Sequence, residues 1–224
     1  MGERIPLATR GGKPFPAWRA TPGDARRAGL VVLHAIWGVT PHIRAFCDGL
    51  ADQGYDVIAP SLLDGTNAFP EQNTDFPILA GRLALGEAVG WGAGCLDVVQ
   101  AAIDTLEGPV NLLGFCFGGT TAWLAACRCE GLSAVACFYG GNIIQYKDET
   151  PHCPTILHFG KTDETIPPAD VAAIEAAHPA LPVWLYDAGH AFVAPSGFHA
   201  DSARLAMLRT LQHFQRGGGV KGEV

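Results

Sequence analysis

Short runs of almost uninterrupted apolar residues recur along the chain and alternate with longer segments in which apolar residues have helical spacing. A run without polar alternation is typical of a strand that is buried on both faces. Six such runs cover residues 30–36, 55–60, 110–115, 132–139, 155–159 and 183–186, and the helical segments cover residues 41–53, 78–106, 120–129, 167–177 and 198–215. This alternation predicts an α/β fold with a mostly parallel central sheet flanked by helices on both faces.

The remaining segments are expected to complete a single domain over residues 1–224. Residues 1–28 are rich in Pro and Gly and predict edge strands or an extended lead-in, and residues 217–224 predict a flexible tail. Glycines within residues 78–106 predict a break in that helix. Residues 61–77 are a turn-rich insertion after the second run, which forms either a lid or pocket wall, or a plain surface excursion.

Composition narrows the class of protein. With 48% hydrophobic and 17% charged residues, the 224-residue chain has enough apolar material for a buried core. The net charge of −7 and the absence of a basic run argue against nucleic acid as a partner. No apolar run approaches the roughly 18 residues of a membrane span, and the first residues lack a signal-peptide pattern. A cytoplasmic protein, monomer or homodimer, without a membrane partner is therefore expected.

The cysteines argue against disulfide or metal chemistry. There are seven, an odd number, and none of them forms a Cys-x-x-Cys pair, so reduced thiols are expected. No phosphate-binding or dinucleotide fingerprint follows a predicted strand, and no two histidines have the helical spacing of metal ligands. The sequence therefore predicts neither a cofactor nor a metal site.

The segment 114–119, Gly-Phe-Cys-Phe-Gly-Gly, lies between the run at 110–115 and the next helical segment. A strand, a tight turn with small flanking residues and a helix form a nucleophile elbow, here with Cys116 in place of the commoner Ser. Gly114 and Gly118 would relieve the crowding of such a turn. The free amides at the start of a helix favour a thiolate, so Cys116 is predicted to be reactive. The alternative is a chance motif in which Cys116 is a small core residue.

In α/β-hydrolases the nucleophile is followed along the chain by an acid and then a histidine. Asp163 follows the run at 155–159, and His190 follows the run at 183–186. Alone, each would be interpreted as a turn former or a hydrogen-bonded structural residue, but their joint order favours a Cys116, Asp163 and His190 triad. Glu164 competes for the role of the acid, and Asp187 is an alternative local partner of the histidine.

An acyl-transfer site also needs hydrogen-bond donors for the oxyanion that develops on the substrate. The candidates are the backbone amides of Phe117, after the nucleophile, and Ile36, in the loop after the first run. Further candidates for the pocket are His34, for which a packing role is favoured, and Ala35, Trp37 and Phe192.

Taken together, these motifs resemble the dienelactone hydrolase family, which has the α/β-hydrolase fold, over nearly all of residues 29–214. The matching stretches are Ile-Trp-Gly-Val-Thr-Pro-His-Ile-Arg at 36–44, Gln-Gly-Tyr-Asp-Val-Ile-Ala-Pro at 53–60, Gly-Phe-Cys-Phe-Gly-Gly at 114–119, Gly-Lys-Thr-Asp at 160–163 and Ala-Gly-His-Ala-Phe at 188–192. The resemblance implies the same triad and the same two oxyanion donors that were chosen from the residues.

Two positions depart from the pattern of the family that the chain resembles. Ala35 stands where its best-known members have a glutamate that helps to control the protonation of the thiol. Ala194 stands where its dienelactone-specific enzymes have an arginine that binds a substrate carboxylate. Arg82 or Arg44 could replace that arginine, although Arg44 is better interpreted as bracing its helix.

The sequence therefore predicts a cysteine-dependent hydrolase of ester, lactone or thioester bonds in small molecules, acting through an acyl-enzyme. One alternative is a non-catalytic binding protein on the same fold. A second is a thiol redox protein that uses Cys127 and Cys129, but cysteines two residues apart on a helix point to different faces, which favours buried packing.

Overall fold

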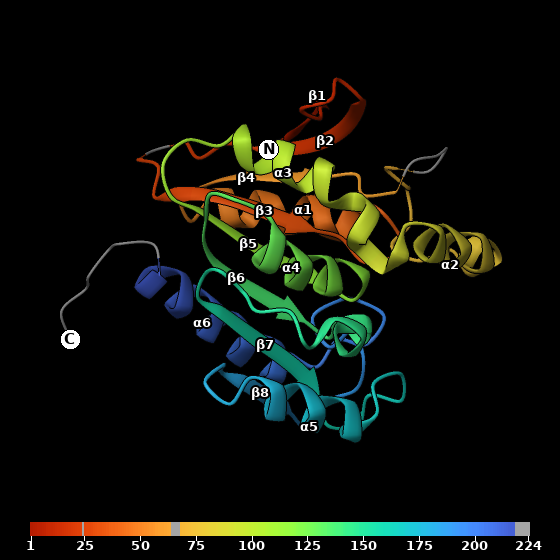
Figure 1. The fold of residues 1–224 in the computed structure, drawn as a ribbon. Helices are drawn as coiled ribbons and strands as arrows, with labels where there is room; N and C mark the ends of the chain where they lie inside the picture. The colour runs from red at the N-terminus through yellow and green to blue at the C-terminus, as the bar shows by residue number, and fades with distance from the viewer. Residues whose placement is uncertain (24, 64–67, 218–224) are drawn as a thin grey trace.

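A computed structural model describes residues 1–23, 25–63 and 68–217 of the chain, which are built around an eight-stranded sheet with the order β1-β2-β4-β3-β5-β6-β7-β8 (Figure 1). The strands are β1 (Glu3–Ala8), β2 (Pro14–Ala20), β3 (Ala28–Leu33), β4 (Tyr55–Pro60), β5 (Val110–Phe115), β6 (Leu132–Phe138), β7 (Thr155–Gly160) and β8 (Val183–Tyr186). Strands β3 to β8 are mutually parallel. The predicted α/β fold with a mostly parallel sheet is therefore confirmed.

The N-terminal residues form a hairpin at one edge of this sheet. Strand β1 pairs antiparallel with β2, and β2 pairs antiparallel with β4. Pro6 lies within the edge strand β1, where a missing amide costs no ladder hydrogen bond on the open side.

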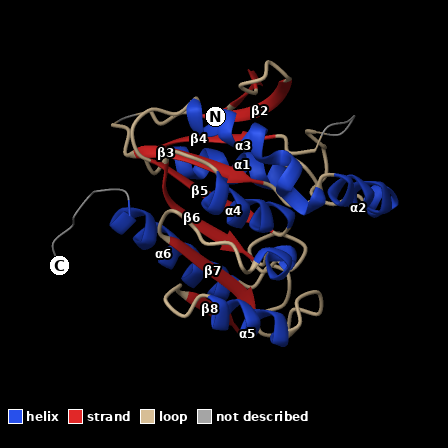
Figure 2. Cartoon of the chain, viewed as in Figure 1, coloured by secondary structure: helices blue, strands red, loops and turns tan. Residues whose placement is uncertain are grey.

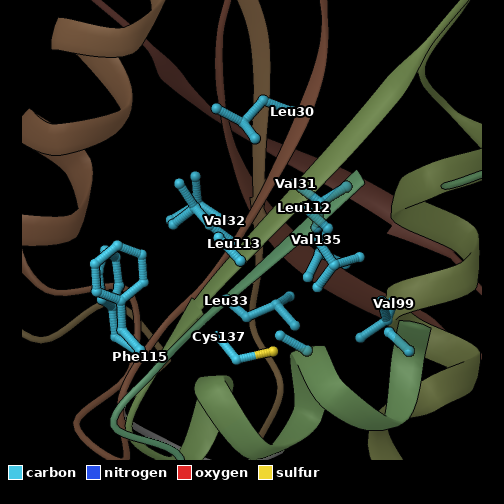
Figure 3. Close-up of a cluster of buried hydrophobic side chains, with 14 of the residues drawn as sticks. Leu30, Val31, Val32, Leu33, Val99, Leu112, Leu113, Phe115, Val135 and Cys137 are labelled. Atoms are coloured by element: carbon cyan, nitrogen blue, oxygen red, sulfur yellow. The ribbon is translucent and has the colours of Figure 1, made fainter. Parts of the chain in front are cut away.

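The central strands carry the core. Every residue of β3, β4, β5 and β7 is buried, as the apolar runs predict. Side chains leave the sheet on alternate faces, so that Val32 and Phe115 lie on one side in Figure 3, and Val31 and Val135 lie on the other with Val99 of a covering helix. A sheet that is apolar on both faces must be covered by helices on both.

Helices cover both faces of the sheet (Figures 1 and 2). They are α1 (Pro41–Ala51), α2 (Leu79–Ala88), α3 (Leu96–Asp104), α4 (Phe117–Arg128), α5 (Pro168–Ala177) and α6 (Ala200–Gly217), with short 3-10 helices η1 (Phe76–Ile78), η2 (Gly90–Cys95) and η3 (Gly141–Tyr146). In Figure 1, α3, α4 and α5 lie in front of the sheet, and α1 and α6 lie behind it. None of the helices in the described ranges is long and apolar enough to cross a membrane.

The break predicted within residues 78–106 is present. It separates α2 from α3 and lies in η2, where Trp91 has φ 49° and Gly92 has φ 118°. A Cβ at Gly92 would come within 3.0 Å of the Cα of Thr121 in α4, so the small residue lets the two segments approach closely.

Three predicted bounds are wrong in an informative way. The run at 30–36 ends as a strand at Leu33, because the next residues turn back, with the amide of Gly38 donating to Ala35 O. The helix predicted from 120 begins at Phe117, directly after Cys116. Gly217, expected in the tail, is the last residue of α6, packed so closely on β6 that a Cβ would lie 2.9 Å from that of Ala134. The rest of the predicted tail, 218–224, lies outside the described residues.

Candidate active site

Cys116 lies at a sharp turn between β5 and α4. Its backbone angles, φ 55° and ψ −113°, are strained for a residue with a side chain. A Cβ at Gly114 would come within 2.5 Å of the carbonyl carbon of Gly118, and one at Gly118 would lie 2.6 Å from His34 O. The two glycines therefore let the elbow close against β3, and the turn presents the partly exposed thiol at the start of α4.

Three side chains from separate loops meet at the carboxyl edge of the sheet. His190, which follows β8, has its Nε2 3.2 Å from Cys116 Sγ. Its Nδ1 lies 2.7 Å from Oδ2 of Asp163, which follows β7. Because the carboxyl ends of parallel strands share one edge, the sheet brings together residues that are 74 and 27 positions apart in sequence. Sulfur, imidazole and carboxylate thus form one hydrogen-bonded chain.

Thr165 holds the carboxylate of Asp163 and was missed by the sequence reasoning. Its backbone amide and hydroxyl both donate to Asp163 Oδ1, at 2.9 and 2.7 Å. The Asp-x-Thr spacing is that of an Asx turn, a local signal that could have identified it. Glu164 is exposed, and Asp187 pairs with Lys161 at 2.6 Å, so neither competitor is hydrogen-bonded to His190.

The charges at this site favour a protonated imidazole. Burial acts to lower the pKa of His190, but the hydrogen bonds that its ring nitrogens make to Asp163 and Cys116 outweigh it and raise this pKa to about 10. Burial acts to raise the pKa of Asp163, whereas the hydrogen bonds from His190 and Thr165 lower it, with a net shift downward. The arrangement therefore stabilises an imidazolium that is paired with the Asp163 carboxylate.

Aromatic rings pack around the imidazole. The Tyr139 ring meets that of His190 edge-on, with centroids 5.1 Å apart, and Phe192 packs behind Tyr139 at 5.3 Å. Tyr139 and Ala191 both have positive φ, 39° and 58°. Such strain persists only where the surroundings impose it, and it clusters at functional sites.

The two candidate oxyanion donors lie in segments that meet at the elbow. Phe117 is the first residue of α4, whose first amides have no helical acceptor. Ile36 lies in the β3–α1 loop, next to the segment that Gly118 contacts. Within the described residues, neither of the two amides donates to a protein acceptor.

A small recess of about 30 Å³ adjoins the site. Two of the pocket candidates, Ala35 and Trp37, line it together with Gly38, Thr40, His42, Ile43, Asn73, Thr74, Phe115, Ala194, Pro195 and Ser196. Asn73 and Thr74 belong to the insertion 61–77, which therefore supplies part of the wall; its residues 64–67 lie outside the described part of the chain.

Two other pocket candidates lie elsewhere. His34 and Phe192 are completely buried and are not among the residues that line the recess. His34 is hydrogen-bonded to Ala35 O and to the amide of Leu62, at 2.6 and 3.0 Å.

The two candidate arginines have protein partners. Arg82 donates its Nε–H to Ile36 O at 2.7 Å, and Arg44 lies over the Trp18 ring at 5.9 Å. Among the residues that the structure describes, no three His, Cys, Asp or Glu side chains are grouped so that they could hold a metal ion.

Five of the six other thiols are buried in the core, and that of Cys153 is partly buried. No disulfide joins any two of the seven cysteines, all of which lie in the described ranges. Burial raises the pKa of Cys127 to about 12 and that of Cys129 to about 11. This disfavours the thiolates that a redox pair would need.

Known proteins share this sequence and architecture. The model of the dienelactone hydrolase family matches residues 15–217. A carboxymethylenebutenolidase of Pseudomonas putida is 30% identical, over 94% of this chain and 95% of its own length. A relative from Escherichia coli K12 that is classed as a carboxymethylenebutenolidase is 33% identical, over 94% and 85%.

Solved structures agree with these sequence relatives. A Klebsiella pneumoniae protein classed as a dienelactone hydrolase superposes with a TM-score of 0.81 at 25% identity, over 96% of this chain and 99% of its own. A dienelactone hydrolase-like promiscuous phosphotriesterase from metagenomic libraries has a TM-score of 0.74 at 19% identity, over 97% and 99%, and so shares the fold. With the family model covering nearly the whole sheet and its helices, the chain belongs to the dienelactone hydrolase family of α/β-hydrolases.

Proposed function

We propose that the protein hydrolyses ester, lactone or thioester bonds of small molecules through a covalent acyl-enzyme on Cys116. The observation that carries this proposal is the hydrogen-bonded chain from Cys116 Sγ through both nitrogens of His190 to Asp163 Oδ2. Membership in the dienelactone hydrolase family supports hydrolysis as the reaction class.

In the first half of the reaction, the Cys116 thiolate attacks the carbonyl carbon of the substrate. A C–S bond forms, and the carbonyl π electrons move onto the oxygen, where the amides of Ile36 and Phe117 donate to it. When the tetrahedral intermediate collapses, the alkoxide leaves and takes the proton from His190 Nε2. The product is a thioester on Cys116 and a neutral imidazole.

In the second half, water replaces the alcohol. The neutral His190 removes a proton from water as the oxygen attacks the thioester carbon, and the C–S bond then breaks to release the carboxylic acid. His190 keeps the proton while Cys116 leaves as a thiolate, which restores the ion pair. Asp163 keeps the ring in the tautomer that points Nε2 at the sulfur.

The nucleophile also limits the substrate class. A thiolate is a better leaving group than an amine, so a tetrahedral intermediate formed from an amide returns to reactants. Alkoxides and thiolates leave readily enough to compete with Cys116. The chemistry therefore favours esters, lactones and thioesters over amides.

The test compares two partly buried cysteines. Cys116→Ala should lower the turnover of p-nitrophenyl acetate by more than about 1,000-fold without a change in melting temperature. Cys153→Ala is the matched control, because burial raises the pKa of the Cys153 thiol, and it should retain activity. Iodoacetamide at neutral pH should modify Cys116 before Cys153, as mass spectrometry would show.

Turnover by Cys116→Ala at the wild-type rate would rule out the assignment of the nucleophile. A wild-type protein that turns over neither p-nitrophenyl acetate nor a small lactone would instead support the non-catalytic binding protein.

A further inference from the structure

We infer that His34 and Arg82 are positioning residues which hold the peptide carrying the Ile36 amide toward the substrate oxyanion. The inference rests on the proposed function, because it assigns a task to residues around one of the two proposed donors. Neither side chain lines the recess, and both are almost completely buried, at 0% exposure for His34 and 5% for Arg82.

The tautomer of His34 follows from its two partners. The amide of Leu62 can only donate, so Nε2, 3.0 Å away, must accept and carries no proton. Nδ1 therefore carries the hydrogen and donates it to Ala35 O at 2.6 Å. Burial lowers the pKa of His34 to about 4, which keeps this neutral tautomer near pH 7.

The bond to Ala35 O controls the direction of the Ile36 amide. The Ala35 carbonyl and the Ile36 N–H belong to one peptide unit, which is planar and trans, so they point in opposite directions. The hydrogen bond that holds Ala35 O toward His34 therefore points the Ile36 N–H away from His34. Gly38 donates a second hydrogen bond to the same oxygen at 3.2 Å, and donors on a carbonyl polarise its amide into a stronger donor.

Arg82 restrains the next peptide unit. Its Nε–H donates to Ile36 O at 2.7 Å from helix α2. On the same helix, a Cβ at Gly86 would come within 3.0 Å of Ile36 Cδ1, so α2 is packed closely on this residue. Hydrogen bonds from the β3–α1 loop and from α2 therefore hold the carbonyls of Ala35 and Ile36, respectively.

The loop also lies against the nucleophile elbow. The absence of a side chain at Gly118 lets the first turn of α4 contact the carbonyls of Leu33 and His34. A rotation of the 35–36 peptide would therefore change the distance from its amide to the oxyanion while leaving Cys116 and His190 in place.

Two substitutions of His34 separate its two hydrogen bonds. In His34→Asn, the amide nitrogen takes the position of Nδ1 and can still donate to Ala35 O. In His34→Gln, the longer side-chain amide takes the position of Nε2. It can accept the hydrogen bond from the Leu62 amide, but it does not donate to Ala35 O. We expect His34→Gln to lower kcat for p-nitrophenyl acetate by about 10- to 100-fold, less than the loss of a whole oxyanion donor, with KM unchanged. His34→Asn should recover kcat to within about threefold of the wild type.

The alkylation rate of Cys116 separates the positioning role from a merely structural one. A general disturbance of the site would change this rate, whereas a misplaced oxyanion donor would not. Displacement of iodide from iodoacetamide by Cys116 forms no oxyanion, so its rate should be the same in both variants and the wild type. His152→Gln, the same substitution at an exposed histidine, should affect neither rate. Equal turnover by His34→Gln and the wild type, or equal losses in His34→Gln and His34→Asn, would overturn the role of His34.

Arg82 provides an independent check should the His34 variants fail to fold. Arg82→Met should lower kcat without slowing alkylation, and Arg82→Lys should recover part of the loss by restoring a donor to Ile36 O. Unchanged kcat in Arg82→Met would overturn the role of Arg82. A failure of the proposed function itself is distinguishable, because the wild-type protein would then show no esterase activity.

Discussion

At the scale of single residues, the proposed site depends on an imidazole, that of His190, whose pKa is raised by its neighbours. His190 keeps a proton because Asp163 on one side and Cys116 on the other compensate for its burial. Thr165 occupies the second oxygen of Asp163, so that only Oδ2 is left to face the imidazole. The raised pKa of His190 stabilises the fold fully below its ordinary value of 6.5, and this contribution is lost as the pH rises toward 10.

The first prediction concerns the removal of the Asp163 carboxylate. Asp163→Asn should move the pKa of His190 down from about 10 toward its ordinary value, because the imidazolium loses its negative partner. NMR titration of the imidazole measures this shift. Turnover should fall by at least about 100-fold.

Asp187→Asn is the matched control for that substitution, since Asp187 pairs with Lys161. It should leave the titration of His190 in place. If His190 titrates alike in Asp163→Asn and in the wild type, the electrostatic account of the site is wrong.

At the scale of elements, the elbow works because α4 begins where β5 ends and lies directly on β3. The turn places Cys116 at the first free amides of the helix, and the close contact requires glycine at position 118. The cost of this arrangement is a strained backbone at Cys116, which the neighbouring strands maintain through the bond from its amide to Phe138 O, at 2.9 Å.

The second prediction tests the contact between helix and strand. Gly118→Ala should lower the free energy of unfolding by about 3 kcal/mol, because its Cβ would lie 2.6 Å from His34 O and the backbone there cannot move aside cheaply. Urea denaturation measures the change. Gly49→Ala, in α1 with open space around it, should instead be neutral or stabilise by up to about 1 kcal/mol. Equal stability of Gly118→Ala and the wild type would contradict the packing described.

At the scale of the whole molecule, buried neutral histidines join layers that lie far apart in sequence. His158 of β7 bonds to the Tyr186 hydroxyl of β8 at 2.8 Å and to Thr210 of α6 at 3.0 Å. Burial lowers its pKa to about 3, as it lowers that of His34 to about 4. The fold is therefore stabilised above pH 6.5, and this stabilisation is lost as the pH falls toward these values, because only the unfolded chain binds the protons.

The oligomeric state and the cytoplasmic location stay predictions.

The third prediction follows from this linkage. As the pH falls from 6.5 to 5, each of these two histidines should lower the free energy of unfolding with a slope that approaches about 1.4 kcal/mol per pH unit. His158→Gln should reduce the slope of the free energy of unfolding against pH by the equivalent of about one proton near pH 5. This holds whatever the effect of the substitution on stability at pH 7. Denaturation curves over this range give the slope. An unaltered slope in His158→Gln would refute the linkage.

Local patterns in the sequence determined much of this protein. Apolar runs specified the parallel strands, because a strand buried on both faces tolerates few polar residues. The Gly-x-Cys-x-Gly spacing indicated the elbow. The order of Cys116, Asp163 and His190 after successive strands was informative because parallel strands end at a common edge.

Only the tertiary structure decided which groups complete the site. His34 bonds to Leu62 across 28 positions, and Arg82 bonds to Ile36 across 46, contacts that depend on how loops and α2 dock on the sheet. The ends of β3 and α6 were likewise set by the turn at Ala35 and by packing on β6. Periodicity reports which face of an element is buried, but a hydrogen bond between distant segments requires their relative positions, which one sequence does not encode in any local pattern.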